Sequence, residues 1–310
     1  MSRTSRWAAI DIGTNSALLL IVERHSHALR SVVDRATITR LGEGVDQTRK
    51  LGPAAIQRTL DCLREYANVL SAHGVDRLSV VATSALRDAQ NAEVFLDRAS
   101  GILGVVPRVI SGTEEADLAF FGALSGLPLE GPIVVADIGG GSTEIISGTT
   151  GQGRRNLGFG VSLDIGSVRL TERWLRSEPL GESALQSAAS DARSLLKGVT
   201  RPQLPFVLVG IAGTVTTLAC VSMGAQKYES ERVHGSQLSL LEVERLCDEL
   251  AHMSLDERRR VPGLEPRRAD VIVGGALVLR ELMSYLGAVD VTVSDRGVRW
   301  ALVERASSSD

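Results

Sequence analysis

Two aspartates, each followed by a run of small residues, are the first features of this sequence that could do chemistry. Asp11 opens the stretch DIGTNS and Asp137 opens DIGGGSTE, while Gly213 and Thr214 belong to a third turn, GIAGTV. Glycine-rich turns let backbone N–H groups converge on an anion such as phosphate, and neighbouring hydroxyls add donors. One such turn alone would indicate an ordinary hairpin. Three of them, two with matching aspartates, favour phosphate binding.

The two aspartates could also hold a metal ion. Asp11 and Asp137 each lie where an apolar strand is expected to end, so each carboxylate can reach past the strand towards a ligand. Carboxylates completed by phosphate oxygens and waters suit Mg²⁺, a hard cation that prefers oxygen ligands. An aspartate that hydrogen-bonds its own turn would give the same sequence pattern. Both interpretations stay open at this point.

A pair of glutamates could supply a base. Glu114 and Glu115 lie at the start of an expected helix, in the stretch ISGTEEADL. Acidic residues are common there because they complement the helix dipole. A glutamate that faces a bound substrate could instead act as general base on a water molecule. The residues alone do not separate these two roles.

The elements that must position these residues include a repeated device. Residues 7–23 and 133–148 each contain an apolar strand, the sequence Asp-Ile-Gly, a short turn and a second apolar strand. This pattern predicts two β-hairpins and hence two related halves that face each other. Helices are expected at 53–73 and 182–197, among other segments that alternate with strands. Such alternation indicates an α/β fold.

The length of 310 residues favours two domains. The stretch GLPLEG at 126–131 is the best candidate linker, so we expect an N-terminal domain at 1–126 and a C-terminal domain at 127–310. An alternative returns the final helix, 297–310, to the N-terminal domain.

Composition excludes several classes of protein. The net charge of −3 gives no general attraction for nucleic acid or for an anionic membrane. Three widely spaced cysteines form neither a disulfide framework nor a metal motif, which favours a reducing cytoplasm. The first residues lack the apolar core of a signal peptide. Residues 202–226 carry no charge, but their glycines favour a buried strand, turn and helix over a membrane span.

At this point the chain resembles the exopolyphosphatase/guanosine pentaphosphate phosphohydrolase family, within the actin-like ATPase superfamily. The resemblance covers nearly the whole chain and is carried by the combination and order of its motifs. These are AAIDIGTNS, VVATSALRDAQNAEVFL, VISGTEEA, VVADIGGGSTE, SLDIGSVRLTE, GIAGTVTTLA, VHG, RRADVIVGG and SDRGVR. The resemblance implies an actin-like fold of two duplicated, ribonuclease H-like halves, with the active site in the cleft between them.

The resemblance also implies roles for single residues. Glu115 matches the family's proposed catalytic glutamate, with Glu114 the weaker choice, and Arg87 would contact phosphates. Asp137, with Glu144 and Asp11, would hold Mg²⁺ or Mn²⁺. The two phosphate loops would comprise Gly13, Thr14, Asn15, Ser16, Gly139, Gly140, Gly141, Ser142 and Thr143.

Three further assignments follow from the remaining motifs. Gly213 and Thr214 would close the far side of the site. Arg268 and His234 lie in family-like motifs, although a surface salt bridge and a loop-capping imidazole are ordinary alternatives.

The activity implied is an exopolyphosphatase that releases orthophosphate from the ends of inorganic polyphosphate. Guanosine pentaphosphate hydrolysis is the alternative, with guanosine penta- or tetraphosphate as ligand. It is disfavoured because Leu18 stands where many relatives carry an arginine implicated in handling the nucleotide. A non-hydrolytic nucleotide-binding regulator and an actin-like kinase are the competing classes, and a homodimer is a further option.

Overall fold

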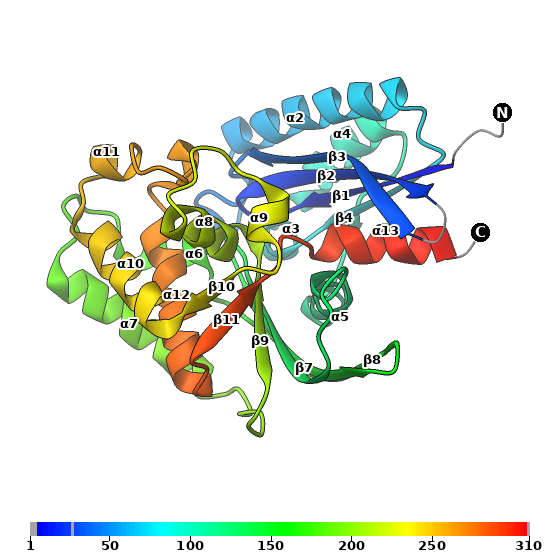
Figure 1. The fold of residues 1–310 in the computed structure, drawn as a ribbon. Coiled ribbons are helices and arrows are strands. Elements are labelled where there is room, and N and C mark those ends of the chain that lie inside the picture. The colour runs from blue at the N-terminus through cyan, green and yellow to red at the C-terminus, as the bar shows by residue number, and fades with distance from the viewer. Residues whose placement is uncertain (1–4, 26–27, 309–310) are drawn as a thin grey trace. The chain divides into compact units, whose positions relative to one another are not determined.

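The computed structural model describes residues 5–25 and 28–308. Contacts within the chain divide it into two compact units, Met1–Leu118 with Val298–Asp310 and Ala119–Gly297. Each unit is built on one mixed β-sheet flanked by helices (Figure 1). The division falls inside helix α5 (Gly112–Ala123). The domain boundary expected at 126/127 stays a prediction.

The sheet of the first unit has five strands in the order β3-β2-β1-β4-β5. Strands β1 to β3 are antiparallel, and β4 and β5 continue the sheet in parallel with β1. The strands are β1 (Arg6–Ile12), β2 (Ser16–His25), β3 (Ala28–Ile38), β4 (Arg77–Ala82) and β5 (Arg108–Val109). The helices besides α5 are α1 (Val45–Thr48), α2 (Pro53–Ala72), α3 (Ser84–Asp88), α4 (Ala92–Leu103) and α13 (Val298–Ser308).

Helix α2 forms where the sequence predicts it. Pro53 occupies its first turn, where the missing N–H costs nothing. The face that carries Ile56, Leu60 and Leu63 is buried in the core of the first unit, against apolar residues of β1 and β2. Helix α13, although last in the chain, packs on β1, β2 and β4 of the same unit.

The sheet of the second unit has six strands in the order β10-β11-β9-β6-β7-β8. Its strands are β6 (Gly131–Ile138), β7 (Thr143–Gly151), β8 (Arg154–Leu163), β9 (Val207–Ile211), β10 (Gln237–Ser239) and β11 (Asp290–Val293). Its helices are α6 (Ser167–Trp174), α7 (Glu182–Leu196), α8 (Ala212–Ser222), α9 (Ser230–Val233), α10 (Leu240–His252), α11 (Leu255–Arg258), the 3₁₀ helix η1 (Pro266–Arg268) and α12 (Ile272–Leu286). Helix α12 is buried on nearly all sides, because it packs against α6, α7, α8 and α10.

The two sheets repeat one arrangement. In each, three antiparallel strands are followed by a strand parallel to the first, which is β4 in one unit and β9 in the other. Asp11 pairs with Leu18 across the first hairpin, and Asp137 pairs with Glu144 at the same place in the second. The predicted α/β fold with duplicated, actin-like halves is therefore confirmed.

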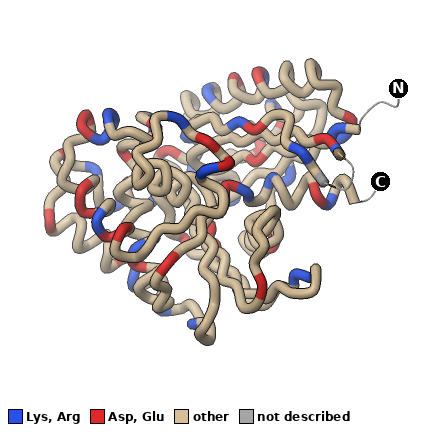
Figure 2. The backbone as a smooth tube through the Cα atoms, in the orientation of Figure 1, with Lys and Arg blue, Asp and Glu red and all other residues tan. Residues whose placement is uncertain are grey.

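The distribution of charged and apolar residues in the structure agrees with what the composition indicates. Acidic and basic residues are interspersed along the backbone of both units (Figure 2). The uncharged stretch at 202–226 contains β9 and α8, as expected. In the described part of the chain, none of the helices combines the length and the apolar character that a membrane crossing requires.

Candidate active site

The first phosphate loop is a closed hairpin turn whose carbonyls face one side. The Gly13 N–H donates to the Ser16 carbonyl at 3.0 Å. The carbonyls of Thr14 and Asn15 accept hydrogen bonds from backbone N–H groups of the 39–42 segment at 2.9–3.0 Å. A trans peptide holds its C=O and N–H on opposite sides. The N–H groups that follow these carbonyls therefore point away from the 39–42 segment.

Three side-chain atoms of this hairpin, two on Asn15 and one on Asp11, are buried without a hydrogen-bond partner among the described residues. Neither Asn15 Nδ2 nor Asn15 Oδ1 makes a hydrogen bond with any described residue, and Asp11 Oδ1 also accepts none. Buried polar groups of this kind cost free energy unless a ligand, ion or water completes them. The hairpin thus presents an amide and a carboxylate oxygen whose hydrogen-bonding capacity the described protein does not use.

The second predicted phosphate loop is closed by a hydrogen bond like that of the first. Three of its carbonyls, rather than two, accept hydrogen bonds from a neighbouring segment. The Gly139 N–H donates to the Ser142 carbonyl at 3.0 Å. The carbonyls of Gly139 and Gly140 accept from the first three N–H groups of α6 at 2.9–3.0 Å, and the Gly141 carbonyl accepts from Arg169 Nε at 2.6 Å. The next three N–H groups therefore face the side opposite α6. Consecutive amides that point the same way form a concave site for an anion.

Close backbone packing explains several glycines around this loop. An added Cβ at Gly166 would lie 2.6 Å from the carbonyl of Gly140, and one at Gly274 would lie 2.6 Å from Thr171 Oγ1 of α6. A Cβ at Gly275 would meet Thr214 Oγ1 at 2.4 Å. Helix α12 thus supports α6, and α6 supports the loop, through contacts that only glycine allows. The paired glycines of α12 are explained by these contacts.

The second hairpin also brings two carboxylates together. Asp137 and Glu144 are direct neighbours across β6 and β7. Glu144 is fully buried and its Oε1 accepts from Ser162 Oγ at 2.6 Å, whereas Asp137 is half-buried. Asp137 is therefore the more accessible of the two oxygen donors.

These donors fit a divalent cation of the Mg²⁺ type. No cluster of three or more histidine, cysteine, aspartate or glutamate side chains suited to a metal occurs among the described residues. Mg²⁺ is commonly held by only one or two carboxylates, with phosphate oxygens and waters filling the remaining positions. Asp137 in one unit, and the unpartnered Asp11 Oδ1 in the other, match that requirement. Whether either residue binds a metal stays a prediction.

The structure separates the two adjacent glutamates. Glu115 is buried, and Arg87 Nη1 donates to its Oε2 at 2.5 Å and to the Ile110 carbonyl at 3.1 Å. Glu114 points outward into a surface ion pair with Arg108 at 2.6 Å. Of the two glutamates, only Glu115 is buried, so only its surroundings could shift the pKa of a catalytic base.

Burial governs the acidity of this group of residues. It raises the pKa of Glu115, and the positive charge of Arg87 opposes that rise. Burial also raises the pKa of Asp11 to about 7, with the Glu115 charge adding to the effect and Arg299 opposing it. Perturbed carboxylates that interact with one another are typical of sites that move protons.

The third turn lies beside Asp137, because Asp137 pairs with Ile211 where β9 meets α8. Ala212, the first residue of α8, has φ of 67°, which is costly for a residue with a Cβ. An added Cβ at Gly213 would lie 1.8 Å from Arg268 Nη1, so the guanidinium lies directly against this glycine. Burial lowers the pKa of Arg268, and Glu265 opposes that effect. A positive charge thus stands at the start of α8.

Comparison with known proteins agrees with this arrangement. A model of the Ppx/GppA phosphatase family matches residues 20–306. The chain is also 39% identical to Exopolyphosphatase 2 of Mycobacterium tuberculosis, over 95% of this chain and 96% of that protein. The chain belongs to the Ppx/GppA phosphatase family. The resemblance inferred from the motifs is therefore confirmed, and the chain is a hydrolase of this family.

Solved structures of the Ppx/GppA family share the fold over the full length. The Aquifex aeolicus member superimposes with a TM-score of 0.82 at 32% identity and covers 99% of both chains. An exopolyphosphatase from Cytophaga hutchinsonii gives a TM-score of 0.88 at 27% identity and covers 98% of both. Both comparisons support the two-unit α/β architecture described above.

His234, a weaker candidate in this Ppx/GppA chain, is part of a polar cluster after β11. Its Nδ1 lies 3.1 Å from Asp295 Oδ1. Burial would raise the pKa of Asp295, but hydrogen bonds from His234, Ser230 and Tyr228 hold it below its usual value. This geometry gives His234 a structural partner, and its role in catalysis stays a prediction.

Three residues of the site were not singled out from sequence. Thr83 hydrogen-bonds Glu115, Ser162 holds Glu144, and Arg169 reaches the carbonyl of Gly141. All three lie inside family motifs, TSALRD and SLDIGSVRLTE, so the motifs marked the segments but not these contacts.

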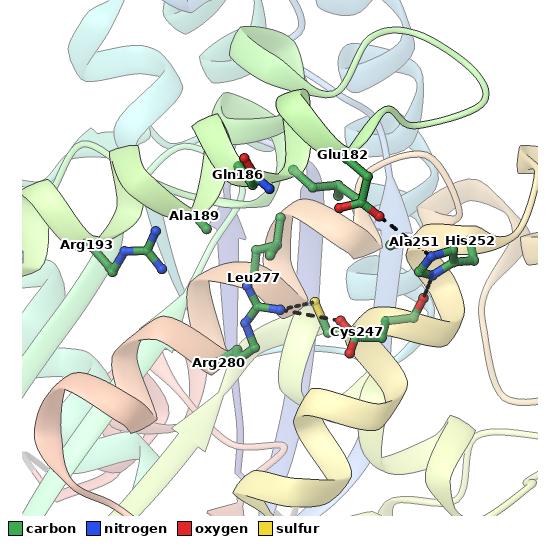
Figure 3. A pocket seen from close by; sticks show the side chains of 11 residues that line it. Glu182, Gln186, Ala189, Arg193, Cys247, Ala251, His252, Leu277 and Arg280 are labelled. Carbon is green, nitrogen blue, oxygen red and sulfur yellow. Dashed lines mark hydrogen bonds and ion pairs between the residues drawn. The ribbon is translucent and has the colours of Figure 1, made fainter.

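A separate hollow of about 200 Å³ lies between α7, α10 and α12 (Figure 3). None of the predicted site residues lines it. Cys247 lies on its wall, with Arg280 Nη1 at 3.9 Å from the sulfur, and burial raises the pKa of this thiol to about 12. The thiol stays protonated at neutral pH, so Cys247 offers neither a nucleophilic thiolate nor a thiolate ligand to this hollow.

Proposed function

We propose that this phosphatase is an exopolyphosphatase, which hydrolyses the terminal phosphoanhydride of inorganic polyphosphate and releases orthophosphate. The observation that carries the proposal is the buried Glu115–Arg87 pair next to Asp11, on the hairpin whose Asn15 amide has no partner among the described residues. That combination suits a water-activating base beside an oxyanion site. The relative from Mycobacterium tuberculosis that bears the name Exopolyphosphatase 2 supports the choice of substrate.

Glu115 would take the proton of the attacking water. As the water oxygen bonds to the terminal phosphorus, the bridging P–O bond breaks and the shortened polyphosphate leaves with the bridging oxygen. A carboxylate with a raised pKa is a stronger base than an ordinary glutamate. Arg87 orients this carboxylate and keeps it ionised, because the ion pair favours its charged form.

The loops would bind the phosphates. Amides that face away from α6 and from the 39–42 segment donate to phosphate oxygens, and Arg268 adds positive charge at the start of α8. Asp137 in the second unit, or Asp11 in the first, would hold Mg²⁺ or Mn²⁺, which would neutralise negative charge on the phosphate oxygens. Hydrolysis of this kind depends mainly on positioning and charge neutralisation, so no covalent intermediate with the protein is needed.

The test is phosphate release from polyphosphates of defined length, with Mg²⁺ or Mn²⁺, beside release from guanosine pentaphosphate. We expect a higher kcat/KM on polyphosphate, since Leu18 stands where many relatives carry an arginine implicated in handling the nucleotide. Preference for guanosine pentaphosphate would reassign the substrate. Binding of either compound without turnover would instead indicate a regulator.

Variants of the two glutamates give a matched comparison. Glu115→Gln keeps the shape of the side chain but removes its basicity, so we expect kcat to fall by about 10²-fold or more. Glu114→Gln breaks only a surface ion pair with Arg108 and should leave kcat within about twofold. Equal losses in the two variants would contradict the assignment of Glu115. Arg87→Ala should raise KM and lower kcat together, because it disturbs both phosphate binding and the base.

A further inference from the structure

Arg258, at the end of α11, is the largest fully buried side chain of the described residues. Its Nη1 donates to the Ala269 carbonyl at 3.0 Å, and its Nη2 pairs with Glu178 Oε1. Its Nε has no hydrogen-bond partner in the described part of the chain. The guanidinium therefore joins α11 to the residue that directly follows Arg268.

Net stabilisation does not explain this arrangement well. Removing a guanidinium from water is costly, and a buried ion pair often contributes no more to stability than a well-packed apolar residue would. The unpartnered Nε of Arg258 adds to that cost. The Arg258 side chain instead fixes the direction of the Ala269 carbonyl, because it donates a hydrogen bond to this carbonyl eleven residues further along the chain.

The 259–271 segment, which links α11 to α12, lies along α8. Near the end of α8, an added Cβ at Gly263 would be 2.5 Å from the Cys220 carbonyl, so the two backbones touch. At the start of α8, the guanidinium of Arg268 lies against Gly213. The segment is thus held at both ends of α8, and the bond from Arg258 to Ala269 fixes the end that carries Arg268.

We infer that Arg258 is a positioning residue for phosphate binding: it holds the Ala269 carbonyl so that the Arg268 guanidinium stays against Gly213 at the start of α8. The inference rests on the proposed function, in which Arg268 contacts a phosphate group of the substrate. Arg258 itself, being fully buried, does not touch the substrate.

A double-mutant cycle tests this coupling. The proteins are wild type, Arg258→Met, Arg268→Met and the double variant. Arg259→Met is the control, because the Arg259 side chain lies in an exposed ion pair with Asp256. We expect Arg258→Met to raise KM for polyphosphate about tenfold, the loss of one charged hydrogen bond, in the wild-type background. In the Arg268→Met background the same change should raise KM by no more than about twofold. The Arg259→Met control should leave KM unchanged.

A second readout does not depend on turnover. The Val271 N–H donates to the Arg268 carbonyl at 3.0 Å, so looser anchoring should speed hydrogen exchange at Val271 in Arg258→Met but not in Arg259→Met. If Arg258→Met does not fold, Arg258→Lys keeps the positive charge on a single donor nitrogen, and should give smaller effects in the same direction.

Two results would overturn the inference. One is an equal rise in KM from Arg258→Met in both backgrounds, because Arg258 would then act through something other than Arg268. The other is unchanged KM together with unchanged exchange at Val271. A wild-type protein that releases phosphate from no substrate would refute the proposed function alone. Calorimetric binding of tripolyphosphate to the same proteins would then measure the coupling between Arg258 and Arg268. Absence of that coupling would overturn the inference.

Discussion

Replacing Gly166 by alanine should disable the second phosphate loop while the fold persists. Gly166 is the N-cap of α6, with extended φ and ψ of −162° and 175° that any residue can adopt, so backbone strain is not the issue. An added Cβ would lie 2.6 Å from both the carbon and the oxygen of the Gly140 carbonyl, whereas ordinary contact begins at 3.4 Å. The loop and α6 must therefore separate by about 0.8 Å, since close-packed backbones do not interpenetrate.

A displacement of that size matters more for catalysis than for stability. Misplacing reacting groups by about 1 Å can cost about 10²-fold in rate, so we expect kcat/KM for polyphosphate to fall by about 30- to 100-fold. The accompanying overpacking should cost about 1–3 kcal/mol of the free energy of unfolding, which leaves most of the molecules folded. Phosphate release and thermal unfolding measure the two effects on the same preparation.

Gly181→Ala is the matched control. Gly181 is also a helix N-cap, at the start of α7, with extended backbone angles and no atom within 4 Å of an added Cβ. It carries the same change in capping preference without the clash. If Gly166→Ala kept kcat/KM within threefold of Gly181→Ala, the argument that loop position depends on this contact would be refuted.

Three other outcomes are expected. Because burial raises the pKa of Glu115 and the base must be ionised, kcat should fall on the acid side at a pH above the ordinary glutamate pKa of 4.5, and Glu114→Gln should not move that limb. All three cysteines are buried, so a thiol reagent at pH 8 should label none before denaturant is added. Gly101→Ala, in open space on α4, should raise the free energy of unfolding by about 0.5–1 kcal/mol. Gly122→Ala, whose Cβ would lie 1.9 Å from the Gly297 carbonyl, should instead lower the melting temperature.

The architecture was largely predictable because it is encoded locally. The Asp-Ile-Gly motifs that begin at Asp11 and Asp137 each sit between two apolar strands, so the duplicated hairpins and the α/β class follow from short-range pattern alone. The glycine loops could be predicted to be anion sites for the same reason. The arrangement of the carbonyls in the second loop could not be predicted from sequence. It depends on α6, whose Arg169 lies twenty-eight residues from its partner Gly141.

The roles of neighbouring charged residues needed the folded structure. The residue pattern alone does not separate Glu114 from Glu115, although the family resemblance favours Glu115. In the structure burial separates the surface partner of Arg108 from the partner of Arg87. Arg258 gave no signal in sequence, since an arginine in a run of charges is ordinarily a solvated one. Its full burial is a product of tertiary packing, and periodicity along the chain does not report it.

The placement of α13 has a consequence for how the protein is made. This helix packs on β1, β2 and β4, yet the ribosome synthesises it after every residue of the second unit. The second unit can therefore fold during translation, while the sheet that carries Asp11 waits with one face uncovered. Until α13 arrives, the apolar residues of that face are open to chaperones or to aggregation, so the unit that carries Asp11 and Glu115 is the last to mature.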